Sequence, residues 1–214
     1  MVGEPHAVRE ARVSASHAPT RTDSRGARDA HDAGAPSRGR VLANLAVFEA
    51  AWFACILGVA HGWPGWGTAA LLGAIAWHVA ISERPGTELA LVAILAAIGL
   101  MAESAMVALG HVAYPAGQPV AWLAPYWMVA LWGEFAIALN VTLRWLKRRL
   151  PLASVLGAIF GPLSFLGGVR LGGARFVDEP AALASLAAMW ACLMPLVMAV
   201  SNRFDGVTSR TTHA

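Results

Sequence analysis

Five ionisable side chains stand inside long apolar stretches of the sequence: Glu49, His78, Glu103, Glu134 and Arg170. A charged side chain in the middle of a bilayer costs roughly 2.5 to 3.5 kcal/mol on insertion scales, so such residues are functional candidates by default. The chemistry open to carboxyl and imidazole groups there is proton transfer. The questions are which of these groups can meet, and which helices would hold them.

Glu49, His78, Glu134 and Asn140 form the candidate intramembrane polar site. Counted from the predicted cytoplasmic ends of their spans, Glu49 lies at a depth of about 12 Å and Glu134 at about 13 Å. His78 and Asn140 lie nearer the surface, so one cavity in the inner half of the membrane could hold all four. Two carboxyl groups in a low dielectric cannot both ionise cheaply, so one is expected to hold a proton. A proton-linked carrier or an acid/base site would use that proton; alternatively, each protonated Glu donates a hydrogen bond to a neighbouring helix.

Glu103 and Arg170 form a candidate structural ion pair. Glu103 is predicted about 22 Å from the cytoplasmic boundary and Arg170 at about 28 Å, where its long side chain could reach down. The span that carries Arg170 also holds small residues three to four positions apart, which permit close helix packing, and a proline, which should kink or locally unwind the helix. These packing and kink residues are Gly157, Gly161, Pro162, Ser164 and Gly168.

The elements that would position these residues are membrane-spanning helices. Hydrophobic residues make up 57% of the chain and charged residues 14%, against roughly 25% charged in soluble domains. Six apolar segments approach the length needed to cross about 30 Å of hydrocarbon. The predicted fold is an all-α bundle of about six transmembrane helices within residues 41–200. The predicted spans are 41–60, 66–81, 88–110, 122–143, 151–171 and 181–200.

The basic residues predict the orientation of the bundle. With both termini on one side, all of the 16 Lys and Arg except Arg170 and Arg175 fall on that side. Positive charge in short loops marks the cytoplasmic face, so the prediction is an N-in, C-in topology. Residues 1–40 lack apolar periodicity and are predicted to be a disordered polar tail, and residues 201–214 a short cytoplasmic tail.

Metal, cofactor and nucleic-acid sites are not predicted. Cys55 and Cys192 lie within apolar segments, and His61 and His111 in outer loops make only a weak metal hypothesis. The basic segments have no interleaved aromatic residues for base stacking. The expected partners are membrane lipid and either other membrane proteins or a second copy of the chain.

Four stretches carry a resemblance to a known family. They are 44–58 (NLAVFEAAWFACILG), Trp77-His78, 131–146 (LWGEFAIALNVTLRWL) and 160–172 (FGPLSFLGGVRLG). The region from about 41 to 200 resembles an uncharacterised family of bacterial inner-membrane proteins, domain-of-unknown-function family 2878. The family pattern commonly has Gln at the position of Glu49 and Asp at that of Glu103. The resemblance therefore implies an acid at 103, does not imply a required carboxylate at 49, and supplies no catalytic residues.

Three functions follow as hypotheses for this multi-pass protein of the bacterial inner (cytoplasmic) membrane. The first is a small carrier or a membrane partner of lipid-modifying enzymes, a lipid link that the resemblance implies. The second is an intramembrane enzyme that acts on lipid, with Glu134, Glu49 and His78 as acid/base groups. The third is a structural assembly subunit joined through the small-residue face around Gly161. Whether the protein is an enzyme stays open at this point.

Overall fold

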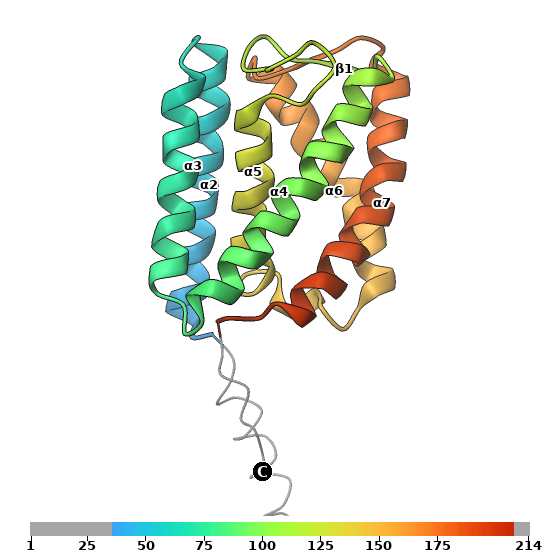
Figure 1. Ribbon diagram of the computed structural model, residues 1–214. Coiled ribbons are helices and arrows are strands. Elements are labelled where there is room, and N and C mark those ends of the chain that lie inside the picture. The colour runs from blue at the N-terminus through green and yellow to red at the C-terminus, as the bar shows by residue number, and fades with distance from the viewer. Residues whose placement is uncertain (1–35, 208–214) are drawn as a thin grey trace, which may run out of the picture. The chain divides into compact units, whose positions relative to one another are not determined.

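The computed structural model describes residues 36–207 and places six α-helices in them, which confirms the all-α fold (Figure 1). The predicted disordered tail lies outside these residues up to residue 35, and so does the end of the predicted C-terminal tail. Residues 38–40, assigned to the tail by the sequence, are instead helical. The helices are α2 (Arg38–Ala60), α3 (Pro64–Ala80), α4 (Pro85–Ala108), α5 (Tyr126–Leu139), α6 (Leu150–Arg170) and α7 (Glu179–Arg203).

Four of these helices, α2, α4, α6 and α7, are long and apolar enough to cross a membrane. They contain 21 to 25 residues, which at 1.5 Å per residue corresponds to about 31 to 38 Å. The other two, α3 with 17 residues and α5 with 14, are shorter and run beside them (Figure 1). The composition and these helices together identify a membrane protein.

Local signals in the sequence set most helix ends. The side chains of Ser37 and Asp178 accept hydrogen bonds from the first turns of α2 and α7, as N-caps do. Proline occupies the first turn of α3, α4, α6 and α7, where its missing N–H is not needed. Gly172 follows α6 with φ at 90°, a left-handed conformation that glycine adopts without strain.

The fourth predicted span, 122–143, is wrong at both ends. Helix α5 begins only at Tyr126, after a loop that ends in Pro125, and it stops at Leu139. Asn140 is the C-cap of this helix, and its side-chain amide donates to Glu88 of α4 and to the carbonyl oxygen of Phe204 after α7. Residues 140–149 then form turns around the 3₁₀-helix η1 (Arg144–Leu146).

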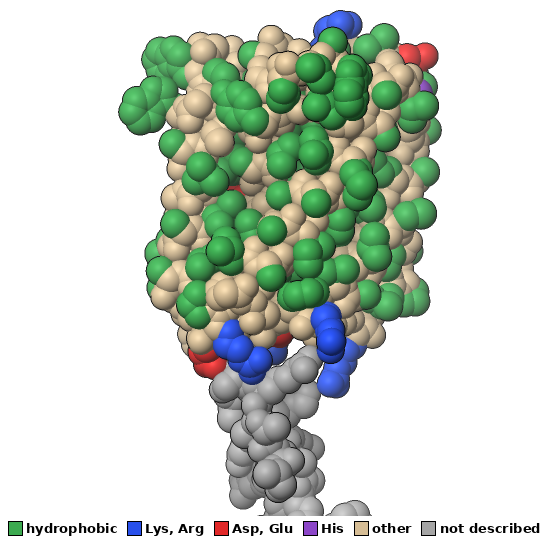
Figure 2. Space-filling view, in the orientation of Figure 1, with side chains coloured by type: hydrophobic (Ala, Val, Ile, Leu, Met, Phe, Trp, Pro, Cys, Tyr) green, Lys and Arg blue, Asp and Glu red, His purple; other side chains and the backbone are tan. Residues whose placement is uncertain are grey.

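The two ends of the bundle differ in character (Figures 1 and 2). One end, called the basic end here, carries most described Lys and Arg side chains: Arg38, Arg40, Arg84, Arg144, Lys147, Arg148, Arg149 and Arg203. The opposite end, called the sheet end, carries a two-stranded antiparallel sheet of β1 (Val112–Ala113) and β2 (Arg175–Phe176). This sheet, which the sequence analysis did not anticipate, ties the loop after α4 to the loop after α6.

A stack of two tryptophans between two glycines joins four helices at the centre of the bundle. Trp132 of α5 and Trp190 of α7 stack with ring centroids 4.9 Å apart and an interplanar angle of 12°. A Cβ atom at Gly99 of α4 would overlap Trp132, and one at Gly161 of α6 would overlap Trp190. Glycine is therefore required on both outer sides of this glycine–tryptophan stack.

The small-residue face of α6 packs inside the chain. A Cβ atom at Gly157 would overlap Trp190 of α7, as at Gly161, so the predicted close packing at these two positions is confirmed. The face is covered by α7, which removes the surface that the assembly hypothesis needed. Helix α6 continues through Pro162 without interruption, so the helix is not locally unwound there, and the alternative, a kink, stays a prediction. Helix α7 packs on α6 at Gly157 and Gly161, in the turn and a half before the proline.

Candidate functional site

The four residues of the predicted polar site do not share one cavity. His78 and Asn140 meet at the basic end through Glu88, a residue that the sequence analysis treated only as a helix boundary. Glu49 and Glu134 lie farther along α2 and α5, close enough for their charges to interact. The structure therefore divides the predicted site into a buried hydrogen-bond network and a carboxyl pair.

Glu88 is the centre of the hydrogen-bond network at the basic end. Its carboxylate is 1% exposed, and its Oε2 lies 2.8 Å from Nε2 of His78. Its Oε1 accepts hydrogen bonds from Nδ2 of Asn140 at 2.7 Å and from the backbone N–H of Gly206 at 2.6 Å. Helices α3, α4 and α5 and the segment after α7 are thus joined through one buried carboxylate.

Two cations complete the network. Nζ of Lys147 donates to Oδ1 of Asn140 at 2.6 Å and to Oδ2 of Asp205 at 3.0 Å, and Arg144 donates to the same Asp205 oxygen at 2.6 Å. Burial lowers the pKa of Lys147, and the adjacent Asp205 carboxylate opposes that shift. Opposite charges are balanced across the network, so we assign it a structural role: it holds residues 204–207 against the helices.

Glu103 is satisfied by two aromatic residues, and the predicted ion pair with Arg170 is wrong. Its carboxyl accepts hydrogen bonds from the Tyr114 hydroxyl at 2.8 Å and from Nε1 of Trp132 at 2.9 Å. Arg170 is exposed at the end of α6, where its charge stays solvated, and no ion pair joins it to Glu103 in the described part of the chain. Neutral aromatic donors reach the acid without the cost of burying a guanidinium group.

Replacing Tyr114 with phenylalanine should lower the free energy of unfolding by about 1 to 3 kcal/mol, because Oε2 of Glu103 would lose its donor in a fully buried place. Reversible unfolding in detergent micelles measures the change. Tyr126→Phe is the matched control, since that side chain is 45% exposed and should change stability little. Equal stability of the two variants would contradict a role for Tyr114 in holding Glu103.

Glu134 is a buried acid that, unlike Glu88 and Glu103, has no hydrogen-bond partner among the described residues. Its side chain is fully buried, and neither carboxyl oxygen has a hydrogen-bond partner among residues 36–207. Cys55 of α2 also lies within electrostatic range of it. A buried polar group without a partner is rare and calls for an explanation, which a structural role does not supply.

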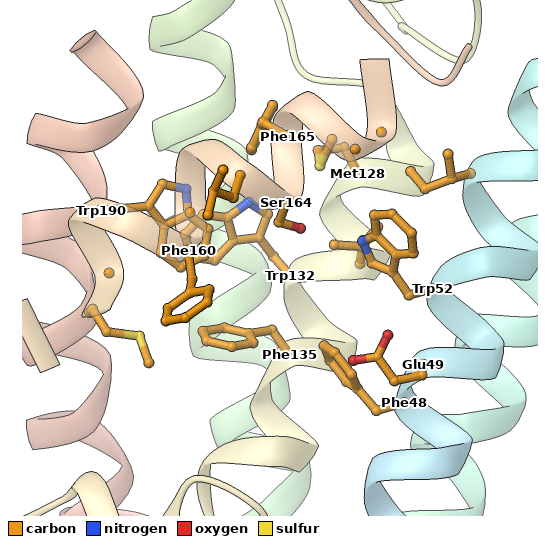
Figure 3. A pocket seen from close by; sticks show the side chains of 18 of the residues that line it. Phe48, Glu49, Trp52, Met128, Trp132, Phe135, Phe160, Ser164, Phe165 and Trp190 are labelled. Carbon is orange, nitrogen blue, oxygen red and sulfur yellow. The ribbon is translucent and has the colours of Figure 1, made fainter. Parts of the chain in front are cut away.

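A cavity of about 560 Å³ lies between α2, α5, α6 and α7 beside the carboxyl pair (Figure 3). Its lining is mostly aromatic, and among the described residues that line it only Glu49 has a charged side chain. Figure 3 shows the aromatic side chains that surround it: Phe48, Trp52, Trp132, Phe135, Phe160, Phe165 and Trp190. Ser164 of α6 supplies the hydroxyl in this lining, and its packing role stays a prediction.

The mouth of the cavity is on the flank of the bundle. Helices α2 and α6 both line the cavity, and they approach each other toward the end that carries the sheet, where Ile56 of α2 lies near Gly168 of α6. The exposed lining residues include Glu49, halfway along α2, and Phe160 and Leu163, halfway along α6. Because these positions are far from both helix ends, the opening faces the hydrocarbon of a membrane that α2 and α6 cross.

Sequence signals for this site existed but were not decisive. Aromatic residues adjoin both acids in the chain, Phe48 beside Glu49 and Phe135 beside Glu134. In an apolar helix such aromatics are as easily explained by packing, and the sequence does not show that α2, α5 and α6 meet.

No curated protein and no solved structure matches this chain. Residues 41–196 match the family described as "Protein of unknown function (DUF2878)", which agrees with the resemblance found in the sequence. The chain belongs to this family of proteins of unknown function.

Proposed function

We propose that this protein is a small membrane carrier that takes an amphipathic, lipid-like molecule from the bilayer into the cavity between α2 and α6. The observation that carries the proposal is the aromatic cavity of about 560 Å³ with its mouth at mid-membrane height. Its volume lies within the range of roughly 300 to 1,000 Å³ that is usual for small-molecule sites. The opening between α2 and α6 would admit an apolar chain without passage through water.

The charge distribution supports the orientation of this carrier. Most of the described Lys and Arg lie at the basic end, whereas Arg170 and Arg175 lie at the sheet end. Positive charge in short loops favours the cytoplasmic side, so the basic end would face the cytoplasm with both ends of the chain inside. The proposed location is the bacterial inner membrane.

The cavity supports a carrier better than an intramembrane enzyme. An acid/base mechanism on lipid would need Glu134 at the substrate, but Glu134 does not line the cavity, and His78 is occupied at the basic end by Glu88. Glu49 alone of the three proposed acid/base groups faces the cavity. A binding role needs only the aromatic wall and the mouth, and both are formed.

Filling the cavity should abolish ligand binding. A Cβ atom at Gly167, on the cavity wall, would touch only the tip of Trp52 at 3.8 Å, so the backbone there has room for a side chain. A leucine at this position would take up part of the cavity volume. The probe is 12-bromododecanol in neutral detergent micelles, because bromine quenches tryptophan fluorescence on contact and the lining is rich in tryptophan. We expect saturable quenching in the native protein and at least a tenfold weaker response in Gly167→Leu.

The matched control is Gly73→Leu, a helical glycine of α3 with no atom within 4 Å of its added Cβ. This variant should bind the probe like the native protein. If Gly167→Leu binds equally well while remaining folded, the cavity is not the binding site and the proposal fails.

Reconstituted vesicles then test the carrier step itself. Exchange of a fluorescent dodecyl probe between the two leaflets should be fast with the native protein and slow with Gly167→Leu.

A further inference from the structure

We infer that the polar end of the bound molecule is an organic cation, a quaternary or substituted ammonium group, held between the Glu49 carboxylate and the neighbouring aromatic rings. The inference rests on the proposed function, since it names the class of molecule that the cavity takes. It is carried by three features of the site: an unpaired acid, rings around it, and the charge of the remaining lining.

Glu49 has no internal partner. Its side chain is exposed halfway along α2, and Figure 3 shows its carboxyl group turned into the cavity. None of the ion pairs or side-chain hydrogen bonds within residues 36–207 involves it. An unpaired carboxylate at this depth of a membrane is costly, and side chains of this kind mark substrate or ion pathways. A cation on the ligand would supply the missing partner.

The rings beside Glu49 favour one kind of cation. Phe48 and Trp52 flank it on α2, and Phe135 of α5 lies opposite (Figure 3). Aromatic faces attract cations through the ring quadrupole, and aromatic cages are the usual binding sites of quaternary ammonium groups. A small metal ion would need several oxygen ligands. The described lining offers oxygen side chains only at Glu49 and Ser164.

The charge around the cavity opposes the other classes of lipid head group. No Lys, Arg or His occurs among the described lining residues, so a phosphate, sulfate or fatty-acid carboxylate would find no cationic partner. Glu49 itself, the charged side chain among the described lining residues, would repel an anion. Charge complementarity therefore selects a cation over a neutral or an anionic head group.

Three probes with the same 12-bromododecyl chain test this inference in neutral detergent micelles. They carry trimethylammonium, hydroxyl or sulfate as the head group, and tryptophan quenching gives the affinity of each. We expect trimethylammonium to bind about tenfold more tightly than hydroxyl, and sulfate to bind least, because the cation gains both a carboxylate and aromatic faces.

Glu49→Gln should reduce the preference for trimethylammonium over hydroxyl to less than about threefold, mainly because the trimethylammonium probe binds more weakly. Glu83→Gln is the control, since Glu83 is an exposed acid in the loop before α4, away from the cavity. Trp52→Leu keeps the acid and removes a ring, so it should lower the preference as well. This second variant keeps the test decisive if Glu49→Gln does not fold.

The outcomes separate the two proposals. If all three probes bind equally and Gly167→Leu abolishes their binding, the proposed carrier stands and the cation preference is overturned. A preference that survives both Glu49→Gln and Trp52→Leu also overturns it. If no probe quenches the native protein, the proposed function fails and this inference fails with it.

Discussion

Replacing Glu88 with alanine is expected to lower the free energy of unfolding by about 3 to 5 kcal/mol, the range found when one partner of a buried ion pair is removed. The carboxylate is 1% exposed and accepts hydrogen bonds from three groups. The variant would remove the shared acceptor of the His78 ring, one Asn140 N–H and the Gly206 N–H. An unsatisfied buried donor alone costs about 1 to 3 kcal/mol.

Reversible unfolding in mixed detergent micelles measures this loss. Glu83→Ala serves as the control, because it removes an exposed carboxylate five residues earlier and should change stability by less than about 0.5 kcal/mol. Limited proteolysis gives a second measurement, since residues 204–207 should become cleavable in the Glu88 variant. Native stability of Glu88→Ala would show that the segment after α7 is held by other contacts.

Gly99→Ala is expected to destabilise the protein by about 1 to 3 kcal/mol, although alanine favours a helix over glycine by about 1 kcal/mol. The added methyl group would overlap Trp132, whose ring is 2% exposed and stacked on Trp190. The ring cannot step aside because Trp190 in turn lies against Gly161 on the far side of the glycine–tryptophan stack.

The control for this prediction is a helical glycine whose added Cβ atom would meet no other atom. Gly73→Ala, in α3 with open space around the new Cβ atom, should stabilise the protein by about 0.5 to 1 kcal/mol. Thermal unfolding of both variants in the same detergent gives the difference, and opposite signs are expected. Stabilisation by both substitutions would contradict the close approach of α4 and α5 at the stack.

The sequence predicts the helices of this protein well because apolar length and proline position are local properties. Helices α3, α4, α6 and α7 each have a proline in the first turn, and the predicted spans begin within three residues of their observed starts. The end of α5 has distant contacts: Asn140, its C-cap, donates a hydrogen bond to Glu88, which is 52 residues away. A helix end with such distant contacts cannot be predicted from one apolar segment alone.

The candidate site was predicted in its residue types but not in its grouping. Glu49 and Glu134 were placed in one layer by counting depth, and their charges do interact. His78 and Asn140 were placed with them because depth alone says nothing of the order of helices around the bundle. The partners of Glu103 were missed for the same reason, since Tyr114 comes from a loop and Trp132 from another helix.

The network around Glu88 also determines when, during synthesis, the bundle can reach its final structure. Glu88 and Gly206 are 118 residues apart, so the carboxylate reaches the membrane long before its last donor has been made. At about 5 to 20 residues per second, that interval is on the order of 10 seconds. During this time the ribosome-bound intermediate holds an acid at the membrane surface with an incomplete set of donors. The closing of the bundle is therefore a late event, timed by the ribosome and not by the insertion of the first helices.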